Sequence, residues 1–387
     1  MASLLETAKK LNKEYKSDNL IIKSNVVPSY TRLSTGAFGL DYVLFGGIPE
    51  GTILQISGQP HSGKTTGACK IMAAYQKAHP DKTCVYVDCE HRLDLNHQAK
   101  MNGLDLDKLY YFGPIGLSGE QITDAIVELQ KSDDIGLIIL DSVPAMIPQV
   151  VLENDLIEDK GMRATMAKKM YPFLAIMASM IKEKRNNLIL INQVRDGGKT
   201  FTGAQIWKEP CNGAISFYSS ISMRFGTRTF TKGDDMDCCK PDGEGSDGFR
   251  LKFKITKNST ASTTRGGGFI TYRYATGQDS LHDLLEIATA FDFIHRVNNI
   301  TYELINLETG EVYADENGNQ LRGKKGDLID YIMTHEDFQK RYVDMLTRYI
   351  SADNTKDESF GQLLDAETNR QIAAEEASVA SSTTKED

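Results

Sequence analysis

The chain has 387 residues, a hydrophobic content of 40% and a net charge of −9. This length is typical of two or three domains with sizeable cores, and the acidic balance alone disfavours nucleic acid as a partner. No apolar run approaches the roughly 18 residues of a membrane span, and the first residues lack a signal peptide's apolar segment, so we expect a cytoplasmic protein without a membrane partner. The six cysteines form no C-x-x-C pair, which argues against a disulfide framework or a zinc site.

The first 31 residues read as an arm that precedes the main fold. Apolar residues at helical spacing predict an amphipathic helix over 3–14, and residues 20–22 are a short strand candidate. An arm this small cannot bury its own apolar face. It therefore docks either on its own core or on a neighbouring subunit, and composition does not separate the two.

Strands and helices then alternate from residue 32 to about residue 277. Strands rich in Ile, Leu and Val between helices predict an α/β fold with a mostly parallel sheet covered on both faces. The carboxyl ends of such strands meet at one edge, where ligands bind. The expected strands are 52–57, 83–88, 136–141 and 187–192, and the expected helices are 68–77, 119–131 and 163–184.

The later part of the chain is predicted to be more antiparallel, and a smaller α/β segment follows it. The expected strands are 215–224, 249–256 and 269–274, with a long loop over 226–248, and the expected helices lie near 280–291, 325–333 and 335–349. The predicted domains are an arm over 1–31, a core over 32–281, a small α/β domain over 282–350 and a tail over 351–387.

The tail is polar and Ser/Thr-rich, and its nine Asp/Glu and three Lys/Arg give it a net charge of −6. Such a composition predicts disorder. The rest of the chain carries only −3, so local basic loops can still bind the phosphates of DNA.

Residues 58–66 match the G-x-x-x-x-G-K-[ST] pattern of a phosphate-binding loop, between an expected strand and an expected helix. Glycines let successive N–H groups turn toward one anion, and the helix start adds partial positive charge. The alternative is a glycine-rich turn that matches by chance. The motif predicts a nucleoside triphosphate with Mg²⁺, with Lys64 on the β- and γ-phosphates and Thr65 on the metal. The loop consists of Gly58, Gln59, Pro60, His61, Ser62, Gly63, Lys64, Thr65 and Thr66.

Three polar residues stand at or just beyond the ends of expected strands. Asp141 is a candidate Mg²⁺ ligand. Glu90 is a candidate general base for the attacking water, and the alternative is a solvated loop glutamate. Gln193 can contact a γ-phosphate and lose that contact on hydrolysis, and the alternative is an amide that anchors a loop.

Two stretches are candidates for binding nucleic acid: 153–169, an acidic turn that leads into basic residues, and 194–213. The second interleaves cations for phosphates with aromatic rings for bases, which suits a single strand. A solvated helix face and an ordinary mobile loop are the respective alternatives. The candidate DNA contacts are Lys160, Arg163, Lys168, Arg195, Lys199, Phe201, Trp207, Asn212 and Gly213.

Six blocks in this order resemble the RecA-type DNA recombinases of bacteria and phages, over residues 2–350. They are STG with GLD at 34–41, the phosphate loop at 58–66, DCEHRLD at 88–94, LDSVPA at 140–145, INQVR at 191–195 and GAISFYSS at 213–220. The resemblance implies an ATP-dependent protein that forms a helical filament on single-stranded DNA and exchanges strands with homologous duplex. It also implies that Glu90 activates water and that Gln193 senses the γ-phosphate.

The same resemblance implies further roles. Asp94 and His97 fall where the family holds adenine, and Tyr274 falls near the nucleotide at the subunit boundary. The 282–350 segment corresponds to the family's duplex-gathering domain and the tail to its regulator, with single-strand-binding and loading proteins as candidate partners. The residues it places at the subunit interface are Leu4, Leu5, Ile21 and Phe217.

One departure concerns a pair of lysines that bacterial members use to reach the neighbour's ATP. Here Lys257 keeps the first and Ser259 replaces the second, while Lys254 and Arg265 are the candidates to compensate. The stretch 160–162 also diverges, and these differences favour a phage-type member.

Two alternative functions match the sequence less well. A ring-forming DNA helicase on the same core would lack the 213–220 block and usually carries an N-terminal helical domain that 31 residues cannot supply. A filament-forming adaptor that uses ATP only as a structural switch would not need Lys64, Glu90 and Asp141 together.

Overall fold

The computed structural model describes residues 3–15, 21, 30–153, 159–199, 201, 205–231, 248–261, 266–290 and 293–351. The chain divides into two compact units, residues 1–31 and residues 32–387, which we describe separately. No helix of the described residues is long and apolar enough to cross a membrane.

The first unit contains the predicted helix, α1 (Leu4–Glu14). Ser3 and Glu6 form a capping box at its start, because each side chain accepts a hydrogen bond from the other's backbone N–H. The Asn12 amide exchanges two hydrogen bonds with the backbone of Ile21. The rest of the strand predicted at 20–22 lies outside the described residues.

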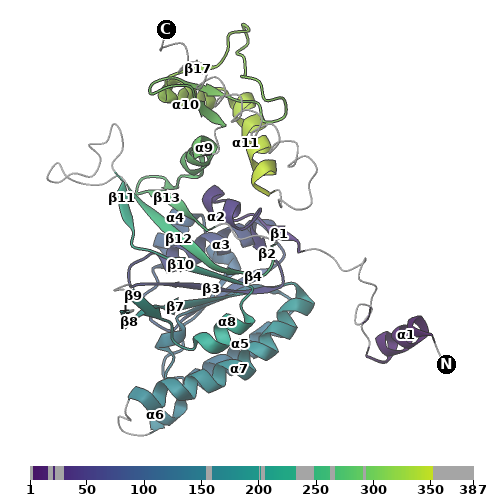
Figure 1. Cartoon of the computed structure of the whole chain (residues 1–387). Helices are drawn as coiled ribbons and strands as arrows, with labels where there is room; N and C mark the ends of the chain where they lie inside the picture. The colour runs from purple at the N-terminus through teal and green to yellow at the C-terminus, as the bar shows by residue number, and fades with distance from the viewer. Residues whose placement is uncertain are drawn as a thin grey trace, which may run out of the picture. The chain divides into compact units, whose positions relative to one another are not determined.

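A ten-stranded sheet forms the centre of the second unit (Figure 1). Its strand order is β14-β13-β12-β10-β3-β7-β6-β4-β5, with β11 paired to β12. Neighbours from β10 to β5 run parallel, and those from β10 to β14 run antiparallel, as predicted. The strands are β3 (Thr52–Gly58), β4 (Thr83–Asp88), β5 (Leu109–Phe112), β6 (Ile135–Asp141), β7 (Asn187–Gln193), β10 (Ile221–Phe225), β11 (Thr229–Thr231), β12 (Gly248–Asn258), β13 (Gly267–Arg273) and β14 (Gly277–Gln278).

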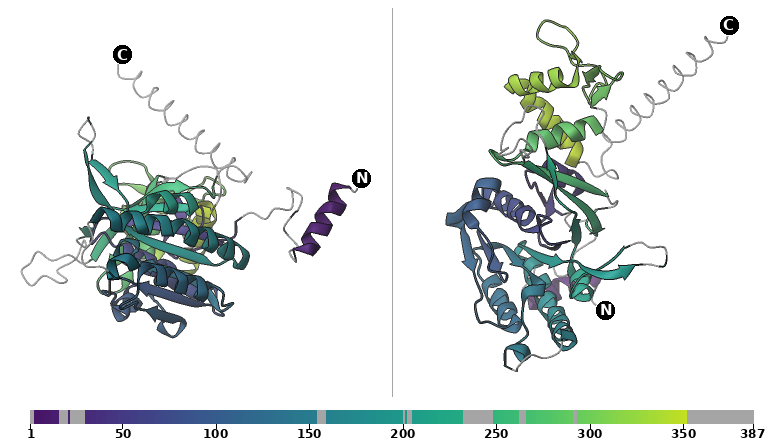
Figure 2. Two further views of the ribbon diagram at one scale, coloured as in Figure 1. Left: turned by 90° about the horizontal axis from the view of Figure 1, so that it is seen from below. Right: turned by 90° about the vertical axis from the view of Figure 1, so that its left-hand side faces the viewer.

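Alternation along the strands divides the apolar side chains between two cores. On β6, Leu137 and Ile139 join the core beneath α3, whereas Ile138 and Leu140 join the core beneath α5 and α7. Figures 1 and 2 show helices covering both faces of the sheet, which is why these strands are apolar on both sides. The helices are α2 (Phe38–Val43), α3 (Lys64–Ala78), α4 (Leu95–Asn102), α5 (Gly119–Gln130), α6 (Gln149–Glu153), α7 (Asp159–Lys184) and α8 (Asn212–Tyr218), and a small sheet pairs β1 (Arg32–Leu33) with β2 (Ile48–Pro49).

Three local predictions were wrong. The strand expected over 215–224 is a helix, α8, followed by β10, because Ala214 and Ile215 pack into the core beneath α7. The stretch 194–213 contains an antiparallel hairpin, β8 (Arg195–Lys199) and β9 (Gln205–Lys208), rather than only a loop. The loop expected over 226–248 includes β11, and its residues 232–247 lie outside the described residues.

The smaller segment after the core has its own apolar centre, against which Phe38 and Tyr42 of α2 also pack. Its three helices fall where they were predicted. The domain boundaries themselves stay predictions, and residues 352–387 lie outside the described residues. The elements are α9 (Ser280–Ala290), β15 (Ile294–Arg296), β16 (Tyr302–Leu304), β17 (Arg322–Gly323), α10 (Lys325–Thr334) and α11 (Glu336–Ser351).

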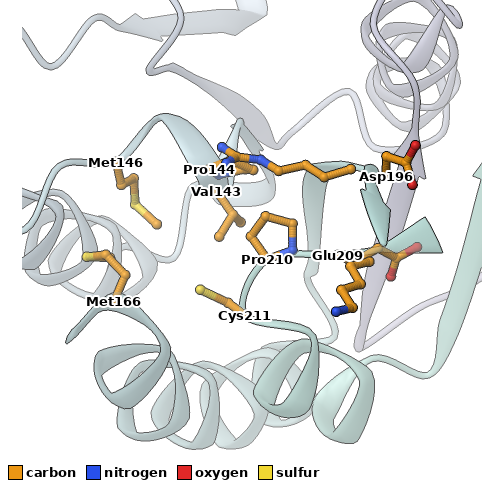
Figure 3. A pocket seen from close by; sticks show the side chains of 10 residues that line it. Val143, Pro144, Met146, Met166, Asp196, Glu209, Pro210 and Cys211 are labelled. Carbon is orange, nitrogen blue, oxygen red and sulfur yellow. The ribbon is translucent and has the colours of Figure 1, made fainter. Parts of the chain in front are cut away.

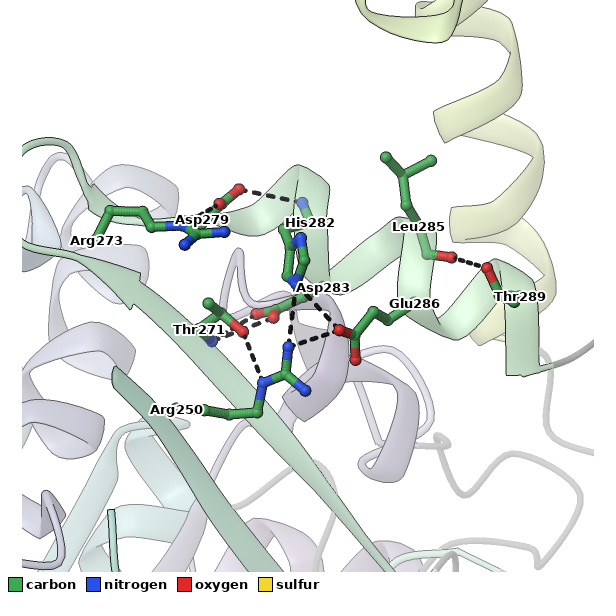
Figure 4. Close-up of polar contacts among 9 residues, drawn as sticks. All are labelled: Arg250, Thr271, Arg273, Asp279, His282, Asp283, Leu285, Glu286 and Thr289. Carbon is green, nitrogen blue, oxygen red and sulfur yellow. Dashed lines mark hydrogen bonds and ion pairs between the residues drawn. The ribbon is translucent and has the colours of Figure 1, made fainter. Parts of the chain in front are cut away.

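A polar network fastens α9 to the sheet (Figure 4). Arg250 of β12 pairs with Glu286 at 2.6 Å, and the buried carboxylate of Asp283 accepts the backbone N–H of Thr271 at 3.0 Å. Burial raises the pKa of Asp283 to about 6. The hydrogen bond from His282, with that from Arg250, lowers the pKa of Glu286 to about 2. The pKa values of the two carboxyl groups are therefore shifted in opposite directions.

Candidate nucleotide and DNA sites

The phosphate-binding loop joins the end of β3 directly to the start of α3, as its motif predicts. Gly63 and His61 have φ values of 85° and 60°, in the left-handed region. A Cβ atom on Gly58 would lie 2.6 Å from Ser62 Oγ, and one on Gly63 would lie 2.4 Å from Leu251 Cδ2. Close packing therefore requires glycine at both positions. The helix α3 begins at Lys64 rather than at residue 68, where it was predicted to begin.

The two cation-binding candidates of the sequence meet at this loop. Thr65 Oγ1 donates to Asp141 Oδ2 at 2.8 Å, and the hydroxyl of Tyr86 donates to the same oxygen at 2.5 Å. Burial raises the pKa of Asp141, and these two hydrogen bonds act against that rise. Burial lowers the pKa of Lys64, whereas the carboxylates of Asp141 and Glu90 act in the opposite direction.

Glu90 and Gln193 also come together, from the ends of β4 and β7. Gln193 Nε2 and Ser142 Oγ donate to the same oxygen, Glu90 Oε1, at 2.5 and 2.7 Å. The backbone around Glu90 is fixed by Asp88, whose carboxylate accepts the N–H groups of Glu90 and Leu93. Neither side-chain donor engages Glu90 Oε2, so this second oxygen is suited to accept a proton.

The loop and its neighbours fit a nucleoside triphosphate with its metal. The hydroxyl of Ser62 is buried in the loop with no hydrogen-bond partner among the described residues. No group of three or more His, Cys, Asp or Glu that could hold a metal occurs in the described parts of the chain. Thr65 and Asp141, which contact each other at 2.8 Å beside the loop, are hard oxygen ligands. Such a pair suits Mg²⁺, which typically takes one or two protein oxygens and completes its shell with phosphate and water.

The residues expected near the nucleoside lie at element ends. Asp94 caps α4, and its Oδ1 accepts the N–H of His97 at 3.0 Å. Both side chains are exposed. Tyr274 follows β13, is 38% exposed and packs its ring against Phe249 at 5.9 Å. The role of these three residues at the nucleoside stays a prediction.

Lys257 lies near the end of β12, beside α8. Its Nζ donates to the carbonyl of Ser216 at 2.7 Å, and burial lowers its pKa. Ser259 donates to the carbonyl of Ser220 at 3.0 Å. Phe217 of the same helix is 72% exposed. Lys254 is exposed on β12, and Arg265 lies outside the described residues.

The hairpin β8–β9 presents the expected mixture of cation and ring. Its register pairs Arg195 with Lys208 and Asp196 with Trp207. Arg195 and Phe201 are exposed, and Trp207 is half-buried. Asn212 and Gly213, which begin α8, and Lys168 on α7 are also exposed, whereas the side chains of Lys160, Arg163 and Lys199 lie outside the described residues.

A cavity of about 410 Å³ lies between the base of this hairpin and the segment that follows Asp141 (Figure 3). Val143, Pro144 and the two methionine side chains of 146 and 166 form its apolar part. Arg195 and Lys208 line it together with the acidic residues Asp196 and Glu209. Apolar side chains and charged residues from the base of the candidate DNA-binding hairpin therefore meet at this cavity.

A family model described as the RecA N-terminal domain matches residues 3–277. The chain belongs to the RecA family. A protein named Protein RecA from Mycoplasma mobile is 30% identical over 90% of this chain and 95% of the relative. DNA repair protein recA homolog 3, mitochondrial, from Arabidopsis thaliana is 31% identical over 84% of this chain and 69% of the relative. A solved RadB recombinase is a distant likeness, with a TM-score of 0.42 and 20% identity over 62% of this chain and 95% of that chain.

Three residues of this RecA-family site were not predicted from the sequence. Tyr86 is a tyrosine in a buried strand, and a buried hydroxyl signals a polar partner, so its contact with Asp141 could have been sought. Ser142 follows Asp141 in the LDSVPA block and carried no role of its own. Glu209 gave no local signal, because its partners lie more than 150 residues earlier in the chain or on β10.

Proposed function

We propose that this RecA-family protein forms filaments on single-stranded DNA and exchanges strands with homologous duplex, at the expense of ATP. The chain is a DNA-dependent ATPase of homologous recombination. The observation that carries the proposal is the junction between the two sites: Gln193 donates to Glu90 at the nucleotide edge, and the exposed hairpin begins two residues later at Arg195. A change at the nucleotide thus has a short covalent path to the DNA surface.

For hydrolysis, the loop at 58–66 holds the phosphates, and Lys64 offsets their charge. Thr65 and Asp141 hold Mg²⁺, which supplies charge stabilisation when it is bound. Glu90 orients the attacking water and accepts its proton through Oε2. Gln193 exchanges its bond to Glu90 for one to the γ-phosphate, and this exchange makes it the sensor of nucleotide state.

For DNA, Arg195, Lys199 and Lys168 bind phosphates, and Phe201 and Trp207 contact bases. The other DNA contacts of this proposal are Lys160, Arg163, Asn212 and Gly213. Asp94, His97 and Tyr274 hold the nucleoside. Free cysteines at positions 69, 84, 89 and 211 agree with a reducing, cytoplasmic location, which belongs to the same proposal.

For assembly, the arm over 1–31 docks on the adjacent subunit through Leu4, Leu5 and Ile21, and Phe217 lies at the same boundary. Lys257 reaches the neighbour's ATP. The segment over 282–350 gathers duplex DNA, the acidic tail regulates it, and single-strand-binding and loading proteins are further partners.

Electron microscopy of the protein on single-stranded DNA with a slowly hydrolysed ATP analogue tests the proposal. We expect continuous helical filaments that require both the DNA and the analogue. Closed rings would instead favour a ring-forming helicase built on the same core, and an absence of any DNA-bound assembly would contradict both.

A further inference from the structure

The hairpin β8–β9 is attached at its two ends to β3, the strand that carries the phosphate loop, and to the neighbouring strand β7. At its first end, the N–H of Val194 donates to the carbonyl of Gly58 at 3.1 Å. At its second end, Asn192 Nδ2 donates to the carbonyl of Pro210 at 2.9 Å. Glu209, directly after β9, adds the strongest set of contacts.

The carboxylate of Glu209 is almost fully buried, with 7% of its side chain exposed. Its Oε1 accepts the hydroxyl of Ser57 at 2.7 Å and pairs with Arg224 Nη2 at 2.6 Å. Its Oε2 accepts Gln55 Nε2 at 2.9 Å. A buried carboxylate is strongly unfavourable unless it is paired and hydrogen-bonded, so these three donors hold Glu209 in one position.

The three donors and Glu209 lie between the phosphate loop and the hairpin. Gln55 and Ser57 are alternate residues of β3, on one face of the strand, and Ser57 directly precedes Gly58, the first residue of the phosphate loop. Glu209 directly follows Lys208, which lies opposite Arg195 in the hairpin. A displacement of the end of β3 therefore reaches the second strand of the hairpin through hydrogen bonds rather than through the chain.

We infer that Glu209 is a positioning residue that couples the nucleotide site to the DNA-binding hairpin, in parallel with Gln193. This inference rests on the proposed function. Glu209 touches neither nucleotide nor DNA in this role; it keeps the hairpin in register with the phosphate loop. Without this link, the hairpin stays folded but no longer reports which nucleotide is bound.

The test measures the affinity of a fluorescent single-stranded oligonucleotide for the full chain, once with a slowly hydrolysed ATP analogue and once with ADP. The coupling is the dissociation constant with ADP divided by the dissociation constant with the analogue. Glu209→Gln keeps the shape and removes the charge. We expect it to lower the wild-type ratio about threefold to tenfold, the size of one ordinary hydrogen bond, with nucleotide affinity within about twofold of wild type.

Two further variants provide an independent test of the link and a matched control. Ser57→Ala removes one donor on β3 and leaves the Glu209–Arg224 pair, so it should lower the ratio by a smaller factor even if Glu209→Gln does not fold. Asp196→Asn makes the same carboxylate-to-amide change on the same hairpin. It should strengthen DNA binding equally with both nucleotides and leave the ratio unchanged.

The outcomes separate the inference from the proposed function. A wild-type ratio of one would contradict the nucleotide control that the proposed function requires. A wild-type ratio well above one that Glu209→Gln and Ser57→Ala leave unchanged would overturn the role of Glu209 alone.

Discussion

The nucleotide edge and the DNA hairpin are neighbours built in opposite ways. Lys64 and Asp141 are buried, with 8% and 7% exposure, and Gln193 at the end of one parallel strand donates to Glu90 just beyond the end of another. The hairpin instead exposes Phe201 and Arg195, and Glu209 attaches its base to β3. Hydrolysis needs fixed geometry, whereas a surface that tracks a flexible polymer needs exposed groups on an element that can shift.

The largest expected effect is at the nucleotide edge. Glu90→Gln should lower ATP turnover by about 10²–10⁴-fold, since it removes the general base, while ATP and DNA binding persist. Steady-state hydrolysis and nucleotide titration measure both quantities. Glu128→Gln makes the same change at an exposed position and serves as the control. Turnover within a few-fold of wild type would remove Glu90 from this role.

A second variant tests whether a neighbouring subunit completes the nucleotide site. Lys257→Ala should reduce DNA-stimulated hydrolysis to near the DNA-independent rate, because the cation that reaches the neighbour is lost, while free subunits still bind nucleotide. Lys254→Ala, on the same strand, tests the described residue that is the other candidate for this role. If stimulation survives the first change and is lost with the second, Lys254 takes the role.

The hairpin should respond in DNA affinity alone. Phe201→Ala should weaken single-stranded DNA binding by about 5-fold to 100-fold, the usual range for one stacked base, and leave DNA-independent hydrolysis unchanged. Fluorescence anisotropy measures the affinity, and Phe201→Tyr should restore it because the ring is kept. A loss of hydrolysis without DNA would show that the two regions are less separate than we describe.

The smallest expected effect on activity lies away from both regions, where α9 joins the sheet. The folded-state pKa of Asp283, about 6, lies above its ordinary value of 3.8, so the folded protein binds this proton more tightly between those pH values. The free energy of unfolding should therefore fall as pH rises from about 4 to 6, by at most about 3 kcal/mol from this group. Asp283→Asn should lack that fall.

Glu286 provides the opposite sign within the same network. Its folded-state pKa, about 2, lies below its ordinary value of 4.5, so its stabilisation is present above pH 4.5 and is lost as pH falls toward 2. Chemical denaturation across pH, with Glu286→Gln beside Asp283→Asn, separates the two. Parallel pH profiles for wild type and both variants would contradict the assignment.

The two regions also differ in how far the sequence predicts them. The phosphate loop, Asp141, Glu90 and Gln193 follow from strand ends and motif spacing, since parallel strands bring their carboxyl ends to one edge. The family and the α/β fold with its mixed sheet were confirmed. The hairpin and α8 were not predicted, because apolar residues around 215 fit both periods and only packing beneath α7 decides between them. The contact of Glu209 with Gln55 spans 154 residues, and no local pattern encodes it.

Strand exchange itself tests the account most directly. The protein is first assembled with ATP on a circular single strand and is then mixed with a linear duplex that is either homologous or unrelated, with Lys64→Ala as the variant that lacks the phosphate-loop cation. We predict joint molecules and displaced strand only with ATP, only with the homologous duplex and only for the chain that keeps Lys64. Unwinding of both duplexes alike, or ATP hydrolysis with no joint molecules, would contradict the account.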